Sequence, residues 1–495
     1  MSLDLRSVAD AFKKFNDHQK IPVFACDYMV IASKSTVAAL NEFVAFKQNI
    51  IQHNIEVLCI EDIQEITRQL TERHKALMLF MHFLHSWKGK PKYLLLVGDC
   101  KSLPGYPVRA FNNNVNSDHR YTVLNDDDYR PWCYVGRISS ENPDEIRNIC
   151  RHLIRYNHLP TESGWHKRVI MTGWTPGSPH RYYFDASGHR ETKPYENYPD
   201  FGDLDEKEAR GLNDTAPVTG IGIPASWHYT NETNGYEVVR SYEWKECSIY
   251  LNNGRPSLAS QHTDCVTHKR IYDPDPLLEI DYWGVRNSSK STLIHAINSG
   301  VVIVKYIGHS DWSHWTNIGH LHCQDSSHWD MCEPLETSLG GTVNERCLTR
   351  WDVKGKIDCR RNPPLILSLS CLAGMIEDPK PDTLDHEEET FAESWQRTCN
   401  AIGVYAASIT SPTYYNARIG RYIFRALTQG FMGSGPIKTV GQALSEANCA
   451  LLRSHIGENG KDKIGNDFEP HNVQLVKDAI RIYRYFGDPE TKLRY

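Results

Sequence analysis

The stretch Leu365-Ile-Leu-Ser-Leu-Ser-Cys371-Leu-Ala-Gly374 is an apolar run that ends abruptly in a cysteine. Asn362-Pro-Pro364 precedes the run and Gly374 closes it, so turn-forming residues bound it at both ends. A short run that is apolar throughout is typical of a strand buried on both faces of a parallel sheet. The stretch therefore predicts a central strand of an α/β fold, with Cys371 at its carboxyl end.

A second apolar run lies upstream and ends in a histidine. It reads Val301-Val-Ile-Val-Lys-Tyr-Ile-Gly308-His309. In open parallel sheets, ligands bind in the crevice outside the carboxyl ends of the strands. If the two strands are neighbours, the Cys371 thiol and the His309 imidazole face each other there as a candidate nucleophile and base.

Strands and helices alternate along most of the chain, which is the pattern of a doubly wound sheet with helices on both faces. The polar segment around Asp118 and 126–128 interrupts this pattern, and we expect it to be a surface loop. The predicted strands outside the two apolar runs are 28–33, 56–61, 93–99, 132–138, 168–173 and 403–408. The main predicted helices are 63–87, 142–156, 291–300 with a Gly stop, 417–428, 437–455 and 473–485.

A junction at 159–164 divides the chain into two predicted subdomains. They are residues 1–160 and residues 165–495, each a mostly parallel sheet within three αβα layers. Residues 175–270 are poor in apolar runs and rich in Gly, Asn, Asp, Tyr and His. A stretch of that length inside a domain is usually functional or an insertion, so we expect a long insertion in the second subdomain.

The composition excludes several classes of protein. The 495 residues are 40% hydrophobic, and 55 basic against 61 acidic residues give a net charge of -6, which argues against a general nucleic-acid binder. No apolar run approaches the roughly 20 residues that span a bilayer. The start, Met1–Asp10, lacks the apolar core of a signal peptide. The 14 cysteines are scattered, so we expect a cytoplasmic protein with mostly reduced thiols and no membrane partner.

The chemistry of a cysteine peptidase requires more than a thiol. A free thiol, with a pKa of about 8.5, is mostly protonated at neutral pH, and a nearby histidine raises the thiolate fraction and later protonates the leaving amine. Two backbone N–H groups must also donate hydrogen bonds to the oxyanion that forms at the substrate carbonyl. Sharp turns after the two strands could present the N–H groups of Cys371 and Ser310. The alternative is that Cys371 is a buried small hydrophobe, as most cysteines are.

Several motifs, in order along the chain, resemble the gingipain-like cysteine peptidases of the caspase clan. The resemblance covers about 28–490, and its motifs are specific in combination although each is weak alone. The motifs are Tyr93-Leu-Leu-Leu-Val-Gly-Asp99, Ser117-Asp118 to Tyr121, Val135-Gly-Arg137-Ile, Tyr306-Ile-Gly-His309, Asn362 to Cys371, Phe391-Ala-Glu393-Ser, Ala401 to Ser408 and Phe486-Gly-Asp-Pro489.

The resemblance implies two caspase-like α/β subdomains and a Cys–His dyad in the second. Carried over by position, Cys371 is the nucleophile, His309 is the general base and acid, and Ser310 and Cys371 form the oxyanion hole. The family usually has Gly where this chain has Ser310, which lacks the backbone freedom of Gly. The resemblance also implies a restricted P1 specificity, with Arg or Lys held by a carboxylate. The candidate carboxylates in or near the 175–270 stretch are Asp203, Asp205, Glu237 and Asp264.

Three further groups of residues are candidates for a role in the site. Trp312 and Trp315, which follow the histidine, are expected to wall the substrate cleft. Glu393 is a candidate site-supporting residue, with a role at its helix N-terminus as an equal alternative. His314, His320, His322, Cys323, His328 and Cys332 could ligate zinc, and Asn125 with Asp126-Asp-Asp128 could hold structural calcium, but neither set has the spacing of a known closed site.

The sequence supports three functions. The first is a cysteine endopeptidase that works through an acyl-enzyme and needs no cofactor for catalysis. The second is a catalytically silent caspase-like module that binds a peptide or a partner protein. The third is a metal-dependent hydrolase that uses the histidine-rich loop. For the first, we expect a regulatory partner or an activating protease, with the 175–270 segment as a regulatory or cleavable insertion.

Overall fold

The computed structural model describes the greater part of both predicted subdomains. The described residues are 26–67, 72–86, 89–125, 130–160, 165–173, 183–184, 190–191, 228–230, 237–241, 290–315, 347–376, 389–428, 436–455 and 472–493.

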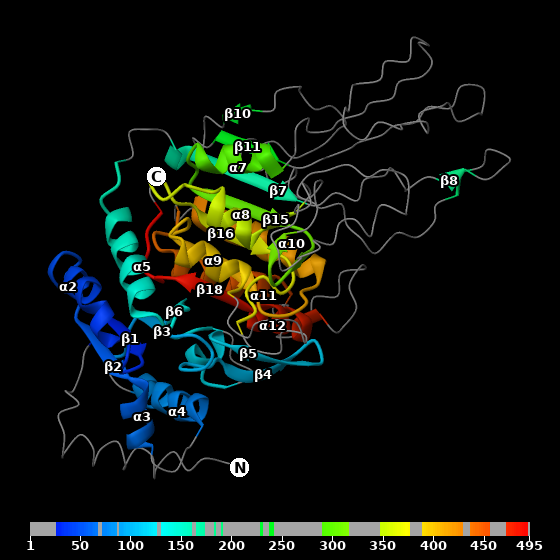
Figure 1. The fold of residues 1–495 in the computed structure, drawn as a ribbon. Coiled ribbons are helices and arrows are strands. Elements are labelled where there is room, and N and C mark those ends of the chain that lie inside the picture. Colours follow the sequence, from blue (N-terminus) through cyan, green and yellow to red (C-terminus); the bar gives the residue numbers. More distant parts are fainter. Residues whose placement is uncertain are drawn as a thin grey trace.

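Among these residues, eleven strands form one continuous sheet (Figure 1). The sheet crosses the predicted boundary at 159–164, because strands from both sides of it hydrogen-bond to one another. In spatial order the strands are β10 (His228–Thr230), β11 (Glu237–Ser241), β7 (Arg168–Gly173), β12 (Ile303–Ile307), β16 (Leu365–Leu369), β17 (Gly403–Ala407), β18 (Tyr483–Gly487), β6 (Tyr134–Ile138), β3 (Tyr93–Val97), β1 (Tyr28–Ala32) and β2 (Ile55–Cys59).

The two halves of this sheet run in opposite directions. Strands β11, β7, β12, β16 and β17 are mutually parallel, and so are β6, β3, β1 and β2. Strand β18 is antiparallel to β17 on one side and parallel to β6 on the other. The carboxyl ends of β12 and β16 therefore lie at the opposite edge of the sheet from those of β1 and β3.

Helices cover both faces of each half, which confirms the predicted three-layer α/β class. In the second half, one apolar cluster packs α7 (Lys290–Asn298), α8 (Arg350–Gly355) and α9 (Phe391–Arg397) on one face, and another packs α10 (Thr413–Thr428), α11 (Val440–His455) and α12 (Asn472–Ile482) on the other. In the first half, the corresponding sets are α2 (Asn41–Asn49) with α5 (Pro143–Tyr156), and α3 (Ile60–Ile66) with α4 (Arg73–Ser86).

Local signals in the sequence explain where several helices begin and end. Asn142 caps α5 by accepting the N–H of Asp144 at 2.9 Å, and Pro143 occupies the first turn, where its missing N–H costs nothing. After α7, Gly300 adopts φ +90°, a conformation that other residues rarely take. This glycine stops the helix and turns the chain into the histidine strand, as the sequence predicts.

Buried charges join the first half to the C-terminal strand. Lys47 of α2 contacts Asp488 at 2.7 Å and Glu490 at 2.6 Å, and the Tyr28 hydroxyl donates to Asp488 at 2.6 Å. Burial alone would lower the pKa of Lys47, but Asp488 and Glu490 outweigh it and raise that pKa. The Gly-Asp-Pro motif thus has a structural role, because Asp488 anchors the end of β18 to the first subdomain.

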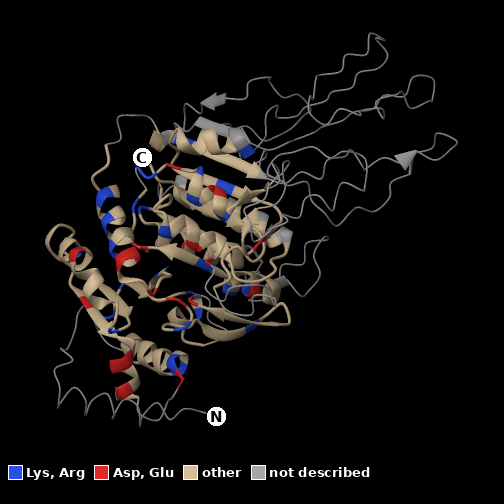
Figure 2. Ribbon diagram, in the orientation of Figure 1, with Lys and Arg blue, Asp and Glu red and all other residues tan. Residues whose placement is uncertain are grey.

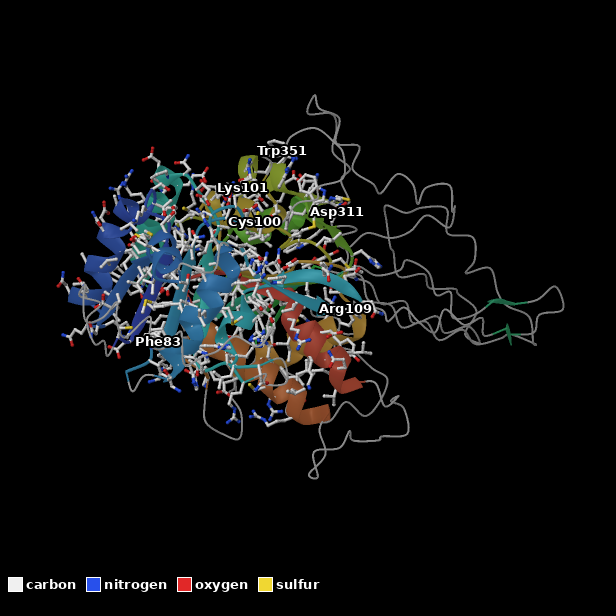
Figure 3. The ribbon with its side chains drawn as sticks, turned by 90° about the horizontal axis from the view of Figure 1, so that it is seen from below. Phe83, Cys100, Lys101, Arg109, Asp311 and Trp351 are labelled. Atoms are coloured by element: carbon white, nitrogen blue, oxygen red, sulfur yellow. The ribbon has the colours of Figure 1, made fainter. Side chains whose placement is uncertain are left out.

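A further contact joins the two halves beside the Cys371 loop. The Cys100 thiol, which follows β3, donates to the carbonyl oxygen of Ile376 at 2.8 Å. Figure 3 shows Cys100 and Lys101 on the side of the molecule that also carries Trp351 and Asp311 of the second half. Basic and acidic residues are interspersed on the described elements around these contacts (Figure 2).

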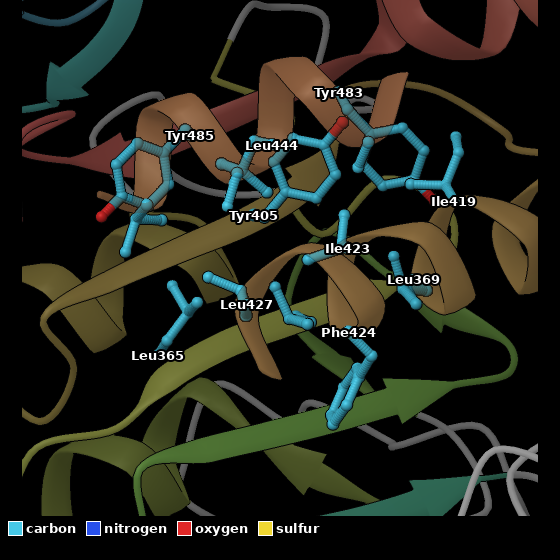
Figure 4. Close-up of a cluster of buried hydrophobic side chains, with 14 of the residues drawn as sticks. Leu365, Leu369, Tyr405, Ile419, Ile423, Phe424, Leu427, Leu444, Tyr483 and Tyr485 are labelled. Atoms are coloured by element: carbon cyan, nitrogen blue, oxygen red, sulfur yellow. The ribbon is translucent and has the colours of Figure 1, made fainter. Parts of the chain in front are cut away.

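The core beneath α10 is tightly packed (Figure 4). Tyr405 of β17 and Tyr483 of β18 stack with their ring centroids 4.8 Å apart, and Ile423 and Leu427 of α10 lie over β16 in the same cluster. A Cβ added to Gly420 would meet Leu369 Cδ1 at 2.4 Å. The glycine therefore lets α10 approach β16 closely, which fixes the position of the loop that precedes this helix.

The structure corrects three predicted elements. The helix predicted over 63–87 is two helices, because α3 ends at Ile66 and α4 begins at Arg73. The surface loop predicted around Asp118 contains a hairpin of β4 (Tyr106–Ala110) and β5 (Asn113–Ser117) and the 3₁₀ turn His119–Thr122. Asp118 itself is buried because Arg137 binds it through two hydrogen bonds of 2.8 and 2.7 Å.

The third correction concerns the end of the chain. The helix predicted over 473–485 stops at Ile482, and β18 begins at the next residue, in the middle of the sheet. Within the 175–270 segment, most of which lies outside the described residues, β10 and β11 extend the sheet beyond β7. This segment therefore contributes to the sheet edge. In the described part of the chain, each helix is too short or too polar to cross a bilayer.

Candidate active site

The two residues singled out in the sequence lie at matching places on neighbouring strands. Strands β12 and β16 are parallel neighbours, as predicted, and Ile307 pairs with Leu369 at their carboxyl ends. His309 and Cys371 each follow these paired residues by two positions. Because neighbouring strands are roughly 4.8 Å apart, the two backbones leave the sheet side by side.

The strand residues that lead to His309 and Cys371 place the Cys371 sulfur beside the loop before α10. Residues Ile303 and Ile307 of β12, and Leu367 and Leu369 of β16, pack in the cluster that contains the helix α10. Side chains alternate along a strand, so two residues further on the chain returns to the same face. The contacts of Cys371 agree, because its sulfur lies against Ser411 in the loop before α10.

The chain turns sharply after Cys371. Leu372 has φ +57°, the left-handed region that costs a non-glycine residue on the order of 1–3 kcal/mol. The Ala373 N–H returns to the Cys371 carbonyl at 2.6 Å, and the Gly374 N–H donates to Ala407 of β17 at 2.9 Å. The turn holds the cysteine at the strand end, with its own N–H at the start of a tight loop.

His309 is half-buried and is held by its own strand. The Tyr306 hydroxyl donates to the His309 carbonyl oxygen at 2.5 Å. Burial lowers the pKa of His309 below the ordinary value of 6.5, so the imidazole is neutral at pH 7. The next residue, Ser310, donates its hydroxyl hydrogen to the carbonyl oxygen of Cys371, which ties the two strand-end loops together.

The backbone N–H of Ser310 points away from the hairpin that follows it. Strands β13 (Ser310–Asp311) and β14 (His314–Trp315) are joined by a two-residue turn. In such hairpins the residues beside the turn form the hydrogen-bonded pair, so the preceding pair, Ser310 and Trp315, is not hydrogen-bonded. The Ser310 N–H is therefore directed to the other side of the strand.

The two tryptophans have different surroundings. Trp315 is fully buried, stacks on Tyr306 with ring centroids 4.5 Å apart and donates its indole N–H to Ser368 at 2.8 Å. The prediction that Trp315 walls a substrate cleft is wrong, because the hairpin turns this side chain into the core. Trp312 is half-buried, and the Arg350 guanidinium lies 4.6 Å from the centroid of its ring. Trp312 remains a candidate for substrate contact.

Glu393 has a structural role at the start of α9. Its carboxylate accepts the N–H of Thr390 at 2.8 Å, and Thr390 caps the helix in return. Ser139 of the first half donates to Glu393 at 2.7 Å, and Arg397 contacts it at 3.0 Å. Glu393 therefore caps a helix and joins the two halves, which supports the helix-terminus alternative.

The metal predictions fall mostly outside the described residues. These include Asp126–Asp128 and every member of the histidine-rich set except His314. His314 is buried against the Ser313 hydroxyl at 3.0 Å, and burial lowers its pKa to about 4. In the residues that the structure describes, no group of three or more His, Cys, Asp or Glu is arranged to hold a metal ion.

The sequence reasoning missed the groups that surround the Cys371 sulfur. The Ser411 N–H donates to the sulfur at 3.4 Å, and the Ser411 carbonyl accepts the thiol hydrogen at 3.6 Å. Ser411 comes from the loop after β17, the next strand in the sheet. The general rule that sites lie beyond the carboxyl ends of parallel strands could have pointed to this loop.

Comparison with known proteins places the fold. The model of peptidase family C25 matches residues 22–494. Among solved structures, the Arg-specific cysteine proteinase gingipain R (RgpB) is similar at 16% identity with a TM-score of 0.60, covering 96% of this chain and 80% of the other. The complex of the pro- and mature domains of Porphyromonas gingivalis RgpB gives 17% identity and a TM-score of 0.58, covering 94% of this chain and 79% of the other. No curated protein sequence matches the chain.

Proposed function

Because the chain belongs to peptidase family C25 and is a cysteine endopeptidase, we propose that Cys371 is its nucleophile and His309 its general base and acid. One observation carries this proposal. The register of β12 and β16 puts the two residues at equivalent places past the ends of adjacent parallel strands, with Ser310 tied to the Cys371 carbonyl between them.

The first half of the reaction forms an acyl-enzyme. The neutral His309 imidazole takes the thiol proton of Cys371, and the sulfur attacks the scissile carbonyl carbon of the substrate. The carbonyl oxygen becomes an oxyanion, and in this proposal the N–H groups of Cys371 and Ser310 donate to it. The C–N bond then breaks, and the imidazolium gives its proton to the leaving amine. The product is a thioester at Cys371.

The second half of the reaction restores the enzyme. Water attacks the thioester carbon, and His309 accepts a proton from that water. The C–S bond breaks and the new carboxylic acid leaves. The proton held by His309 returns to the Cys371 sulfur. A histidine whose pKa lies below 6.5 suits this role, because it is already neutral at pH 7 and able to accept a proton.

A peptidase with restricted specificity has a pocket that selects the P1 side chain of the substrate. We propose that this side chain is Arg or Lys. The solved structure that resembles this chain is described as Arg-specific. A carboxylate is the expected partner of either side chain. Of the candidate acids, Glu237 is the weakest, because it begins β11 and pairs with Arg168, at the amino ends of the parallel strands. Asp203, Asp205 and Asp264 lie outside the described residues and stay candidates.

We also propose that a second segment or protein keeps the enzyme inactive until needed. One similar structure is a complex of pro- and mature domains of RgpB. The 175–270 segment is the candidate for this role here, in line with its length and composition. If the purified chain is fully active from the start and stays uncut over hours, the proposal is wrong.

A fluorogenic peptide library varied at P1 tests the catalytic proposal. We expect the wild type to cleave peptides with P1 Arg or Lys, with or without chelator, and Cys371→Ala to lose this activity. Cys100→Ala is a matched control because Cys100 is also a half-exposed cysteine, and its thiol donates to the Ile376 carbonyl oxygen. Activity that survives Cys371→Ala and falls with chelator would instead indicate the metal-dependent hydrolase.

We further propose that the protein is cytoplasmic, that it needs no cofactor for catalysis and that residues 126–128 hold a structural calcium ion. Cell fractionation tests the first, activity in the presence of chelator tests the second, and the calcium dependence of the melting temperature tests the third.

A further inference from the structure

The sulfur of Cys371 ends a line of polar groups that runs through the core. Ser411 donates to the sulfur twice, through its N–H at 3.4 Å and its hydroxyl at 3.9 Å. Asn416 Nδ2 donates to the Ser411 hydroxyl oxygen at 2.8 Å. The Tyr483 hydroxyl donates to Asn416 Oδ1 at 2.7 Å. Three side chains therefore connect the sulfur to the strand β18.

All the donors in this line are oriented toward the sulfur. The Tyr483 hydroxyl faces the amide oxygen of Asn416, so the amide nitrogen faces Ser411. Because the Ser411 oxygen accepts from that nitrogen, its own hydrogen is available for the sulfur. Donors aligned in this way polarise one another in a buried setting. They favour the charged thiolate over the thiol, since hydrogen bonds to an ionised acceptor are the stronger ones. The Ser411 carbonyl oxygen, which accepts the thiol hydrogen at 3.6 Å, opposes them.

The fold holds these three residues rigidly. Ser411, Asn416 and Tyr483 are all buried, although Cys371 is only half-buried. Asn416 lies in the first turn of α10, where its N–H bonds to the Pro412 carbonyl at 3.1 Å. Tyr483 stacks on Tyr405 and burial raises its pKa well above the ordinary range, so it stays a protonated donor. The titratable groups that the strands place on this face are the buried Lys305 of β12, Tyr405 of β17, and Tyr483 and Tyr485 of β18, and α10 adds Tyr415. His309 follows the end of β12.

We propose that Ser411, Asn416 and Tyr483 are positioning residues that fix the Cys371 sulfur and stabilise its thiolate form. This inference rests on the proposed function, in which Cys371 is the nucleophile. It gives the thiolate a source of stabilisation in addition to His309, and it assigns a role in the active site to the C-terminal strand.

Alkylation of Cys371 by iodoacetamide tests the proposal without requiring turnover. The rate at this one cysteine is followed by mass spectrometry of its peptide over a range of pH, because the thiolate is the reacting form. Ser411→Ala should raise the pH midpoint by roughly one unit, since one hydrogen bond to the charged sulfur is lost. Asn416→Asp should also raise it, because a carboxylate accepts the Ser411 hydrogen and places a negative charge nearby.

The stacked tyrosines supply a matched pair of variants. Tyr483→Phe and Tyr405→Phe each remove one buried hydroxyl, but the Tyr405 hydroxyl faces Asn448 at 3.5 Å. We expect Tyr483→Phe to raise the midpoint by about half a unit through the shared network, and Tyr405→Phe to leave it unchanged. Equal melting temperatures for the two variants would show that stability is not the cause. Equal midpoints for both variants would overturn the proposal.

Two outcomes separate this inference from the proposed function. If Cys371→Ala keeps full peptidase activity, the catalytic proposal fails, and the alkylation midpoints still report on the sulfur. If Cys371→Ala is inactive but Ser411→Ala and Tyr483→Phe leave the midpoint of alkylation unchanged, only the positioning role is refuted. A raised midpoint in both variants, with the folded protein equally stable, supports it.

Discussion

Ser310 donates its hydroxyl hydrogen to the carbonyl oxygen of Cys371, so the loop after the base is bound to the loop of the nucleophile. Glycine, usual at this position in the gingipain-like peptidases, has no side chain with which to form this bond. The hydroxyl therefore compensates in part for the lost backbone freedom of glycine, because it fixes the spacing of the two loops.

Removing that hydroxyl should loosen the site. We expect Ser310→Ala to lower kcat/KM by about fivefold, which corresponds to one ordinary hydrogen bond of about 1 kcal/mol. Steady-state kinetics on the preferred peptide measures the effect. Ser299→Ala is the control, because its hydroxyl also donates to a main-chain carbonyl, that of His295 at 2.8 Å, but on the exposed end of α7. Equal rates for both variants would show that the Ser310 bond has no part in catalysis.

The burial of His309 predicts the acid side of the pH profile. The base must be neutral to accept the thiol proton, and burial lowers its pKa below 6.5. Activity should therefore persist below pH 6.5 and be lost as the pH falls through the folded pKa of His309. A profile of kcat/KM against pH measures this limb. An acid limb centred above pH 7 would contradict the assignment, and His295→Gln, on the surface of α7, should leave the profile unchanged.

The two tryptophans should respond differently to truncation. Trp315→Ala removes a fully buried ring and should destabilise the protein by about 3–5 kcal/mol. Trp312→Ala should change stability by less than about 1 kcal/mol but raise KM, since the half-buried ring belongs to the hairpin that directly follows His309. Thermal unfolding and kinetics on the same samples separate the two effects. If Trp312→Ala leaves both affinity and turnover unchanged, Trp312 does not contact substrate.

The buried Asp118–Arg137 pair predicts a loss of stability in acid. Burial alone would raise the pKa of Asp118, but Arg137 and Arg484 outweigh it and hold this pKa below 3.8. The stabilisation is therefore present above pH 3.8 and is lost as the pH falls through the folded pKa. Asp118→Asn should destabilise the protein by about 3–5 kcal/mol, because it leaves Arg137 buried without its partner charge. Asp144→Asn, at an exposed helix start, is the control, and equal melting temperatures for the two variants would refute this account.

The central part of the fold could be predicted because its strands have a simple signal. The runs ending at His309 and Cys371 are apolar throughout, and they became neighbouring parallel strands. Strand β18 could not be found in this way. It follows α12 without a break, and Tyr483, Tyr485 and Phe486 continue the apolar spacing of that helix. These residues are extended because they form hydrogen bonds with β17 on one side and with β6 on the other.

The candidate site also contains some residues that the sequence predicts and others that it does not. The nucleophile and the base stand at the ends of predictable strands, so the sequence was sufficient to propose them. Trp315 was placed wrongly because a two-residue turn, Trp312–Ser313, decides which of two nearby indoles enters the core. Ser411 and Tyr483 were missed because the hydrogen bonds that link them to Cys371, directly for Ser411 and through Asn416 for Tyr483, depend on elements far apart in the sequence.

The reversal of strand direction at β18 has a consequence for the order in which the protein is assembled on the ribosome. This strand is the last to be synthesised of the eleven, yet it occupies the middle of the sheet. Until it emerges, β17 and β6 are unpaired edges, and the two halves have no hydrogen-bonded connection through the sheet. A nascent chain can thus fold each half separately, but the Tyr483 hydroxyl reaches the neighbourhood of the thiol only after the other ten strands have been synthesised. The surroundings of the thiol are therefore completed last among the elements of this sheet.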